Sequence, residues 1–252
     1  MLRPVVVTRV REAYGPHERH VGDWWLPDGG QERLPTVVFV HGGFWRERYD
    51  LSLEDDVAAD LAARGFLVWN VDYRPSSEPW PATLTDVAAA HDHLGAAARV
   101  DPARTAVVGH SAGGHLALWL ASRHRLPVGA PGAGPAGPPP SLAVAQAPVA
   151  DLAAAARLGL GAGAVLALLG GDPAAVPERL AAADPLGLLP TGVPTVCVHG
   201  AADDDVPIAL SEAYVARAGG SARLVRLPGG HMEHVDPSSD EVAALHEALA
   251  AL

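Results

Sequence analysis

The chain has 252 residues, 49% of them hydrophobic, and a formal net charge of −11 at pH 7. This length fits one large α/β domain. The acidic balance and the absence of lysine argue against nucleic acid or an anionic membrane as a partner, and exclude chemistry that needs a Schiff-base or P-loop lysine. The chain contains no apolar run of membrane-spanning length and its start lacks the apolar stretch of a secretory signal, so we expect a cytoplasmic protein.

Hydrophobic patterning predicts that strands and helices alternate along most of the chain. Two strands joined by a turn come first, and buried strands alternating with helices follow, which is the order of an α/β fold. We therefore expect a mostly parallel central sheet of about eight strands with helices on both faces. The expected strands are 4–10, 19–26, 36–40, 66–72, 105–108, 141–146, 193–199 and 222–227. The expected helices are 53–64, 83–94, the segment after position 111, 208–218 and 239–252.

Two segments do not fit this simple alternation. Residues 127–140 are rich in proline and glycine and predict a mobile surface loop, inserted within a single domain that spans 1–252. Residues 151–186 are alanine-rich helical turns interrupted by glycines, and they are longer than a plain crossover between strands requires. We expect the second segment to form a small helical cap beside the functional site.

The sequence Gly109-His-Ser-Ala-Gly113 lies between an apolar strand and an apolar helix. This is the G-x-S-x-G pattern in the setting where its serine acts as a nucleophile. The glycines two positions to either side of Ser111 allow the close backbone approach that such a sharp, strained turn requires. The helix begins at once, so its first amides would face developing negative charge.

A serine hydroxyl is a weak nucleophile unless a base takes its proton, and the base in turn needs an acid to orient it. The chain offers three successive aspartates, 203–205, after one late strand, and two histidines, His231 and His234, after the next. The carboxyl ends of parallel strands meet at one edge of a sheet, so these groups can approach Ser111. Earlier in the chain, Gly42-Gly43 follows a buried strand and could turn its amides toward the same place as an oxyanion hole.

Four segments together resemble α/β-hydrolases of the carboxylesterase and kynurenine-formamidase-like group, and the resemblance runs from about Tyr14 to the C-terminus. They are His41-Gly-Gly-Phe-Trp45, Gly109-His-Ser-Ala-Gly-Gly-His-Leu116, His199-Gly-Ala-Ala-Asp-Asp-Asp-Val-Pro207 and Gly230-His-Met-Glu-His-Val-Asp-Pro237. Hydrolases of this fold use H-G-x-x-D-x-x-V-P, which implies Asp203 as the acid with Asp204 as the alternative. A Pro-Gly turn before the base implies His231, with His234 as the alternative.

The resemblance also implies an oxyanion hole made by the backbone amides of Ala112, Gly43 and Phe44, with His41 bracing the loop. It further implies a serine carboxylesterase that cleaves a small or medium ester through an acyl-enzyme on Ser111, with no metal or organic cofactor. We expect substrate contacts from Trp45, Trp80, His110 and Met232.

The sequence leaves alternatives open. An arylformamidase that cleaves an N-formylkynurenine-like amide is the closest, because the H-G-G-F-W loop favours it and Tyr73, Trp45 and Trp80 could supply an aromatic pocket. A hydrolase fold kept for ligand binding alone is a third. The expected partner is a small ester or amide substrate, and both a monomer and a homodimer stay possible.

Overall fold

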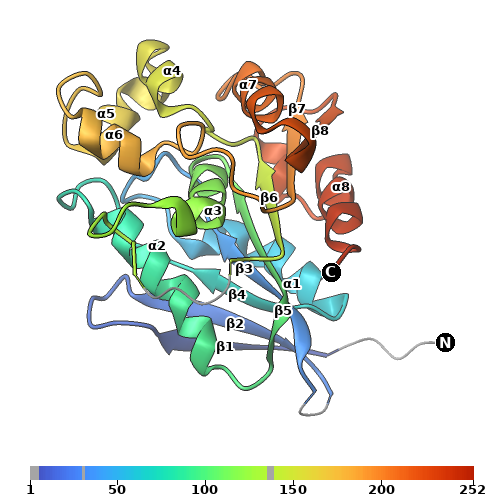
Figure 1. The fold of residues 1–252 in the computed structure, drawn as a ribbon. Coiled ribbons are helices and arrows are strands. Elements are labelled where there is room, and N and C mark those ends of the chain that lie inside the picture. Colours follow the sequence, from blue (N-terminus) through green and yellow to red (C-terminus); the bar gives the residue numbers. More distant parts are fainter. Residues whose placement is uncertain (1–5, 30–31, 135–138) are drawn as a thin grey trace.

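The computed structural model describes residues 6–29, 32–134 and 139–252. Within them the backbone forms one eight-stranded sheet in the order β1-β2-β4-β3-β5-β6-β7-β8 (Figure 1). The strands are β1 (Val7–Ala13), β2 (Val21–Pro27), β3 (Leu34–Val40), β4 (Leu67–Val71), β5 (Val100–His110), β6 (Leu142–Gln146), β7 (Thr195–Gly200) and β8 (Ala222–Leu227). All eight expected strands are present, and β8 has the predicted bounds.

The pairing of the strands is mostly parallel. Only β1 with β2 and β2 with β4 pair antiparallel among the described strands, while every pair from β4 onward to β8 is parallel. The register places Val40 opposite Gly109, and Gly109 opposite Ala145. The ends of β3, β5 and β6 are therefore level at the carboxyl edge of the sheet, where the predicted site should lie.

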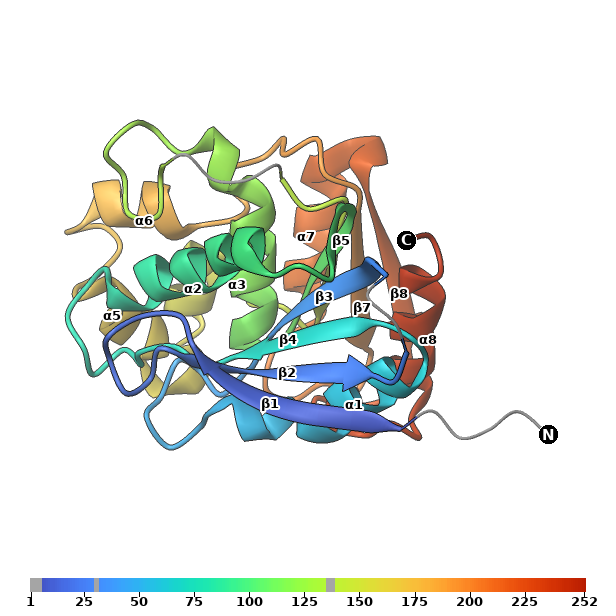
Figure 2. The same ribbon diagram turned by 90° about the horizontal axis from the view of Figure 1, so that it is seen from below.

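Helices cover both faces of this sheet (Figures 1 and 2). Helices α1 (Asp55–Ala63) and α8 (Asp240–Leu249) pack on one face, where their side chains join one core cluster. Helices α2 (Ala82–Asp92), α3 (Ala112–Ser122) and α7 (Ala209–Ala218) pack on the other face. The central strands β3 and β4 are buried on both sides because each side chain on them meets one of these two layers. The fold is that of an α/β-hydrolase, as the resemblance implies.

The helices follow the predicted positions with small differences at their ends. The helix expected at 53–64 is preceded by a 3₁₀ turn, η1 (Leu51–Glu54), which is capped by the Asp50 carboxylate accepting from the amide of Ser52. The last helix ends at Leu249, and Ser239 caps its start by accepting from the Val242 amide. The other elements covering the sheet are α1 (Asp55–Ala63), α2 (Ala82–Asp92), η2 (His93–Ala96), α3 (Ala112–Ser122), η3 (Arg123–Arg125), α7 (Ala209–Ala218), η5 (Gly219–Ser221), η6 (Met232–Val235) and α8 (Asp240–Leu249).

The segment 151–186 forms short helices that gather at one end of the sheet, beyond α3 (Figure 1). We call it the cap segment. It follows β6, so the chain enters it from the carboxyl edge of the sheet. Its elements are α4 (Leu152–Arg157), η4 (Leu160–Ala162), α5 (Ala164–Leu169) and α6 (Pro177–Ala183).

The proline- and glycine-rich segment 127–140 is only partly described, and residues 135–138 lie outside the described part. The described residues 127–134 form turns with no regular helix or strand. The buried Arg123 guanidinium donates two hydrogen bonds to the Gly132 carbonyl, at 3.0 and 2.9 Å, and Gly132 also packs against the Trp119 ring. A buried arginine therefore anchors the described part of this segment at Gly132, while the mobility expected of the loop stays a prediction.

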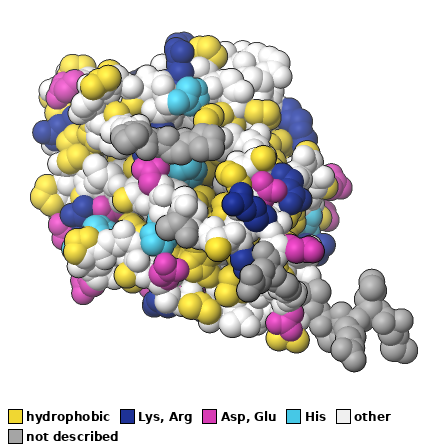
Figure 3. Space-filling model, turned by 60° about the horizontal axis from the view of Figure 1, so that its bottom comes forward, with side chains coloured by type: hydrophobic (Ala, Val, Ile, Leu, Met, Phe, Trp, Pro, Cys, Tyr) yellow, Lys and Arg dark blue, Asp and Glu magenta, His cyan; other side chains and the backbone are white. Residues whose placement is uncertain are grey.

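The described residues contain no helix that is long and apolar enough to cross a membrane. On the face seen in Figure 3, acidic and basic side chains are interspersed with hydrophobic ones.

Two glycines make the contact between β3, β5 and α3 possible. A Cβ on Gly113 would lie 1.9 Å from the Val40 carbonyl oxygen, and one on Gly109 would lie 2.2 Å from the Gly113 carbonyl oxygen. Both distances are far shorter than a van der Waals contact, and the atoms concerned belong to backbone that cannot move aside. The spacing of glycine around Ser111 therefore follows from packing, as its sequence position suggests.

We expect Gly113→Ala to lower the free energy of unfolding by about 3 kcal/mol or more, because the added methyl separates α3 from β3. Gly220→Ala is the matched control, since a Cβ there meets no atom within 4 Å. Urea unfolding followed by circular dichroism measures both variants. Equal stability of the two would contradict the packing argument.

Candidate active site

Ser111 lies at the turn between β5 and α3. Its φ is 58° and its ψ −117°, a conformation that a residue with a Cβ adopts only under strain. The turn is held because the Ser111 amide donates to the Gln146 carbonyl at 2.7 Å and the Ser111 carbonyl accepts from the His115 amide at 3.0 Å. The serine is 1% exposed, and it lines the floor of a cavity.

His231 and Asp203 form a hydrogen-bonded pair at the same cavity. The Nδ1–H of His231 donates to the Asp203 Oδ2 at 2.7 Å, so in the neutral ring the lone pair lies on Nε2. Asp203 comes from the loop after β7 and His231 from the loop after β8. The structure thus brings together Asp203, His231 and Ser111, the three residues that the family pattern selects.

The Asp203 carboxylate is fully enclosed by donors. Its Oδ1 accepts from the amides of Asp205 and Val206 at 2.9 and 2.8 Å, and His199 Nε2 lies 3.3 Å from Oδ2. Burial alone would raise the pKa of Asp203, but the hydrogen bonds from His199, His231 and the Val206 amide outweigh it and hold the pKa well below its usual range. The carboxylate is therefore ionised and oriented. Asp204, the alternative acid, is exposed and points into the cavity mouth.

His234, the alternative base, lies inside the protein. It is 0% exposed, its ring centroid is 5.5 Å from that of His110, and its Nδ1 lies 3.4 Å from the amide nitrogen of Gln146. Burial, helped by the neighbouring histidines His199 and His231, lowers the pKa of His234 to about 3. The ring is a neutral packing group, and it does not line the cavity that contains Ser111.

The loop after β3 approaches Ser111 closely. A Cβ on Gly42 would lie 2.8 Å from the His110 carbonyl oxygen and 3.2 Å from the Ser111 Cβ. Gly43, Phe44 and Trp45 follow with φ of 102°, 52° and 54°, three successive left-handed residues. Gly43 and Phe44 line the same cavity as Ser111, and α3 begins with Ala112 directly after the serine. Strain of this kind is stored where the surrounding structure fixes the backbone.

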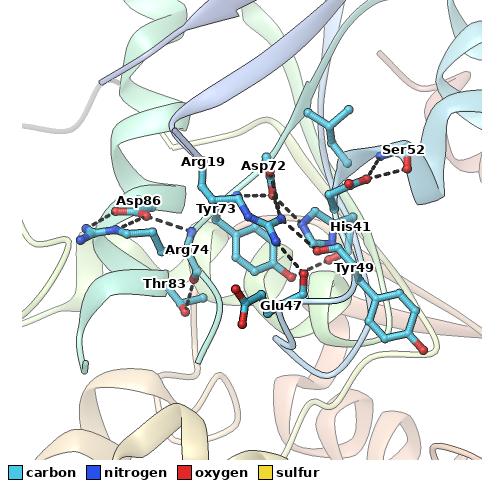
Figure 4. Close-up of polar contacts among 12 residues, drawn as sticks. Arg19, His41, Glu47, Tyr49, Ser52, Asp72, Tyr73, Arg74, Thr83 and Asp86 are labelled. Atoms are coloured by element: carbon cyan, nitrogen blue, oxygen red, sulfur yellow. Dashed lines mark hydrogen bonds and ion pairs between the residues drawn. The ribbon is translucent and has the colours of Figure 1, made fainter. Parts of the chain in front are cut away.

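A polar network behind this loop supplies that support (Figure 4). His41 Nδ1 donates to the Gly42 carbonyl at 2.8 Å, and its Nε2 lies 3.2 Å from the Asp72 carboxylate. The ring stacks on Tyr73, whose hydroxyl donates to the His41 carbonyl at 2.9 Å. Arg19 joins Asp72 to the carbonyls of Glu47 and Tyr49. His41 therefore braces the loop from behind, in the position that the resemblance implies.

The cavity in front of Ser111 has a volume of about 450 Å³. The cap segment closes one side of it, because Phe44 packs on Gly161 and the Arg46 guanidinium donates to the Gly161 carbonyl. Its lining residues are Gly43, Phe44, Arg46, Arg48, Tyr49, Leu53, His110, Ser111, Gly159, Leu160, Gly161, Ala162, Asp204, Asp205, His231 and Met232.

Two of the four residues expected to touch substrate line this cavity, and two do not. His110 forms part of its wall, and Met232 is half exposed at its mouth. Trp45 is 0% exposed, because its left-handed backbone turns the ring into the core against His115, at 5.1 Å between ring centroids. Trp80 packs half-buried against the same core cluster. The burial of Trp45 corrects its expected placement at the substrate, whereas a substrate contact of Trp80 stays a prediction.

The structure adds groups that sequence reasoning missed. His199 orients the acid, although in the sequence it is only the last polar residue of a buried strand. Glu54 lies fully buried beside His110, and nothing in its sequence distinguishes it from an ordinary acidic residue at a helix start. The turn 159–162 lines the cavity, and its two glycines are the only signal that the sequence gives. Among the described residues, no group of three or more His, Cys, Asp or Glu is placed to hold a metal ion.

Known proteins resemble the chain in sequence. An uncharacterized protein of Mycobacterium tuberculosis is 28% identical over 222 residues, which cover 86% of this chain and 69% of that protein. Carboxylesterase NlhH of the same species is 39% identical over 107 residues, 40% of this chain and 33% of the esterase.

Solved structures share the fold. Esterase B from Lactobacillus rhamnosis superposes with a TM-score of 0.80 at 19% identity, covering 98% of this chain and 85% of that one. A bifunctional GH43-CE protein of Bacteroides eggerthii gives a TM-score of 0.78 at 25% identity, covering 96% of this chain and 38% of that one. The family model named BD-FAE matches residues 23–217, most of the chain and the elements that carry Ser111 and Asp203. The chain therefore belongs to the BD-FAE family and is an esterase-like α/β-hydrolase of the carboxylesterase-like group.

Proposed function

We propose that the protein is a serine hydrolase that cleaves a small or medium carboxylic ester through an acyl-enzyme on Ser111. The observation that carries the proposal is the 2.7 Å hydrogen bond between His231 and Asp203 at the cavity that Ser111 lines. An imidazole oriented by a carboxylate, at a serine held in a strained turn, is the arrangement that nucleophilic acyl transfer requires. The similar proteins that are named esterases support an ester as the bond that is cleaved.

In the first step His231 Nε2 takes the proton of the Ser111 hydroxyl as Oγ bonds to the ester carbonyl carbon. The carbonyl oxygen becomes an oxyanion, which the amides of Ala112, Gly43 and Phe44 stabilise. The bond to the leaving alkoxide then breaks, and His231 gives its proton to that oxygen, so that an alcohol departs. Water repeats the sequence with the same base, which releases the acid and restores Ser111. The ionised Asp203 stabilises the imidazolium that forms in both steps.

The cavity favours a short acyl group. Its volume of about 450 Å³ lies toward the lower end of the range of ligand pockets. The case for an arylformamidase rests partly on an aromatic pocket, but Tyr73 and Trp45 are fully buried, and Trp80, which packs half-buried against the core cluster, does not line the cavity. Of the aromatic residues around the site, Phe44 and Tyr49 line the cavity.

Comparing kcat/KM for p-nitrophenyl acetate, butyrate and octanoate with that for N-formylkynurenine tests the proposal. We expect the acetate or butyrate to exceed both the octanoate and the formamide by about 100-fold or more. A preference of that size for N-formylkynurenine would establish the arylformamidase instead. Absence of turnover on all four, in a folded protein that a fluorophosphonate probe does not label, would indicate a fold kept for ligand binding.

A further inference from the structure

Glu54 is a buried acid whose carboxyl group has no hydrogen-bond partner among the described residues. It ends η1 and precedes α1, and its side chain is 0% exposed. Neither of its two carboxyl oxygens makes a hydrogen bond to a described residue. An ionised carboxylate is costly in such a place, so the group keeps its proton. Burial raises the pKa of Glu54 to about 8; the Gly42 amide, which is close to the carboxyl group but forms no hydrogen bond of normal geometry with it, partly offsets this effect.

His110, next to the nucleophile, faces this acid with a second unpaired atom. Its Nδ1 has no partner among the described residues and lies 3.9 Å from the Glu54 Oε1. Its Nε2 lies 2.9 Å from the His231 carbonyl oxygen, which can only accept, so Nε2 carries the proton. Burial, then the proximity of His231 and His234, keeps the pKa of His110 well below its usual range. The neutral ring therefore presents a bare lone pair on Nδ1 toward Glu54.

The other ionisable groups near the pair are already engaged. On the side of Glu54, the Asp55 carboxylate pairs with Arg9 at 2.7 Å, and the Tyr73 hydroxyl donates to the His41 carbonyl. On the side of His110, the nearby groups are His231 and Asp203, which are hydrogen-bonded to each other, and His234, which is buried and neutral. Nδ1 of His110 is thus the acceptor that suits the Glu54 proton.

We propose that Glu54 is a positioning residue of the serine-hydrolase site, whose carboxyl O–H donates to His110 Nδ1 after a side-chain shift of about 1 Å to normal hydrogen-bond length. The bond fixes the tautomer and tilt of the His110 ring. That ring holds the backbone carbonyl of His231 through Nε2 and packs against the His231 ring, with centroids 4.6 Å apart. Glu54 therefore sets the position of the catalytic base through one intermediate. The inference rests on the proposed function, because it assigns a role in supporting that base.

The arrangement makes the site sensitive to alkaline pH. When Glu54 loses its proton, a carboxylate faces the lone pair on Nδ1. The His110 proton then moves to Nδ1, and the bond to the His231 carbonyl is lost. The free energy of unfolding depends on the same group, because the ordinary pKa of Glu is 4.5 and the pKa of Glu54 in the folded protein is about 8. The stabilisation that the protonated Glu54 contributes is therefore complete below pH 4.5 and is lost as the pH rises through 8.

The test compares the full-length wild type with Glu54→Gln and Glu54→Leu on a short p-nitrophenyl ester between pH 6 and 9.5. Wild-type kcat/KM should fall above about pH 8. The Gln amide can still donate to Nδ1 but does not titrate, so Glu54→Gln should stay within about 3-fold of wild type at pH 7 and lose the alkaline fall. Glu54→Leu should lose about 10-fold in kcat at pH 7 with KM within about 2-fold. Glu47→Gln, which changes an exposed acid of the loop that precedes η1, is the control that should behave as wild type.

Melting temperatures give a readout independent of turnover, since Tm should fall between pH 5 and 8 in the wild type and change less in both Glu54 variants. A wild-type profile with no alkaline fall rejects the positioning role without any variant. The positioning role is also rejected if kcat/KM of Glu54→Gln falls above about pH 8 as in the wild type, or if Glu54→Leu keeps the wild-type kcat. Failure of a fluorophosphonate probe to label Ser111 in the wild type would instead overturn the proposed function, so the two failures are distinct.

Discussion

Alanine in place of Ser111 is expected to lower kcat/KM for a short ester by about 10⁴- to 10⁶-fold. The loss is this large because, in the proposed mechanism, the hydroxyl oxygen is the atom that bonds to the substrate, and none of its neighbours in the turn can replace it. Ser111 is 1% exposed, and its turn is held by hydrogen bonds of its backbone amide and carbonyl. Because alanine keeps these groups, removal of the hydroxyl should leave the fold intact. Initial rates with saturating and limiting ester measure the loss, and Tm verifies folding.

The matched control is Ser77→Ala, which removes an exposed serine hydroxyl in the loop between β4 and α2 and should retain full activity. Mass spectrometry after treatment with a fluorophosphonate should locate the label on Ser111 in the wild type and in Ser77→Ala. Activity above about 1% in Ser111→Ala, or a label on a different residue, would mean that the acyl-enzyme forms elsewhere or not at all.

The second large effect is expected from Asp203→Asn, which should lower kcat by about 10³- to 10⁴-fold. The amides of Asp205 and Val206 donate to Oδ1, so the Asn carbonyl oxygen will occupy that place. The NH₂ group of the Asn side chain must then face Nδ1 of His231. Because NH₂ is a hydrogen-bond donor, Nδ1 can only accept from it and must be unprotonated. The imidazole proton moves to Nε2, the atom that should receive the serine proton, and the base is blocked.

Asp204→Asn is the matched control, because it removes one negative charge at the neighbouring residue. Asp204 is exposed at the cavity mouth, and we expect the kcat of this variant to stay within about 3-fold of wild type. Kinetics of both variants at one pH, with Tm as the check on folding, decide between the two aspartates. A larger loss in Asp204→Asn than in Asp203→Asn would reverse the assignment of the acid.

The low pKa of Asp203 has a consequence for acid conditions. A folded pKa below the unfolded value means that the ionised group stabilises the fold above the unfolded pKa, and that this stabilisation is lost as pH falls through the folded pKa. The acid of the site therefore remains ionised throughout the range in which esterase assays are performed.

The sequence by itself determined the layered architecture and the strand-to-helix turn at Ser111, because both depend on local patterns. Buried strands read as continuous apolar runs, and the glycines around Ser111 are required by backbone contacts as short as 1.9 Å for an added Cβ. The order of serine, acid and base along the chain placed all three after strands whose ends meet at one edge. These features need only the identity and spacing of residues.

Only the tertiary structure decided which of several equivalent residues faces the site. Three consecutive aspartates differ in side-chain direction, and Asp203 alone has its carboxylate enclosed by His199, His231 and two amides. Trp45 looks exposed in a glycine-rich loop, but positive φ at Phe44 and Trp45 turns its ring into the core. Glu54 resembles an acid that favours a helix start, yet packing against the Gly42 loop and His110 removes it from water. Direction and burial arise from contacts between distant segments, and a linear pattern does not contain them.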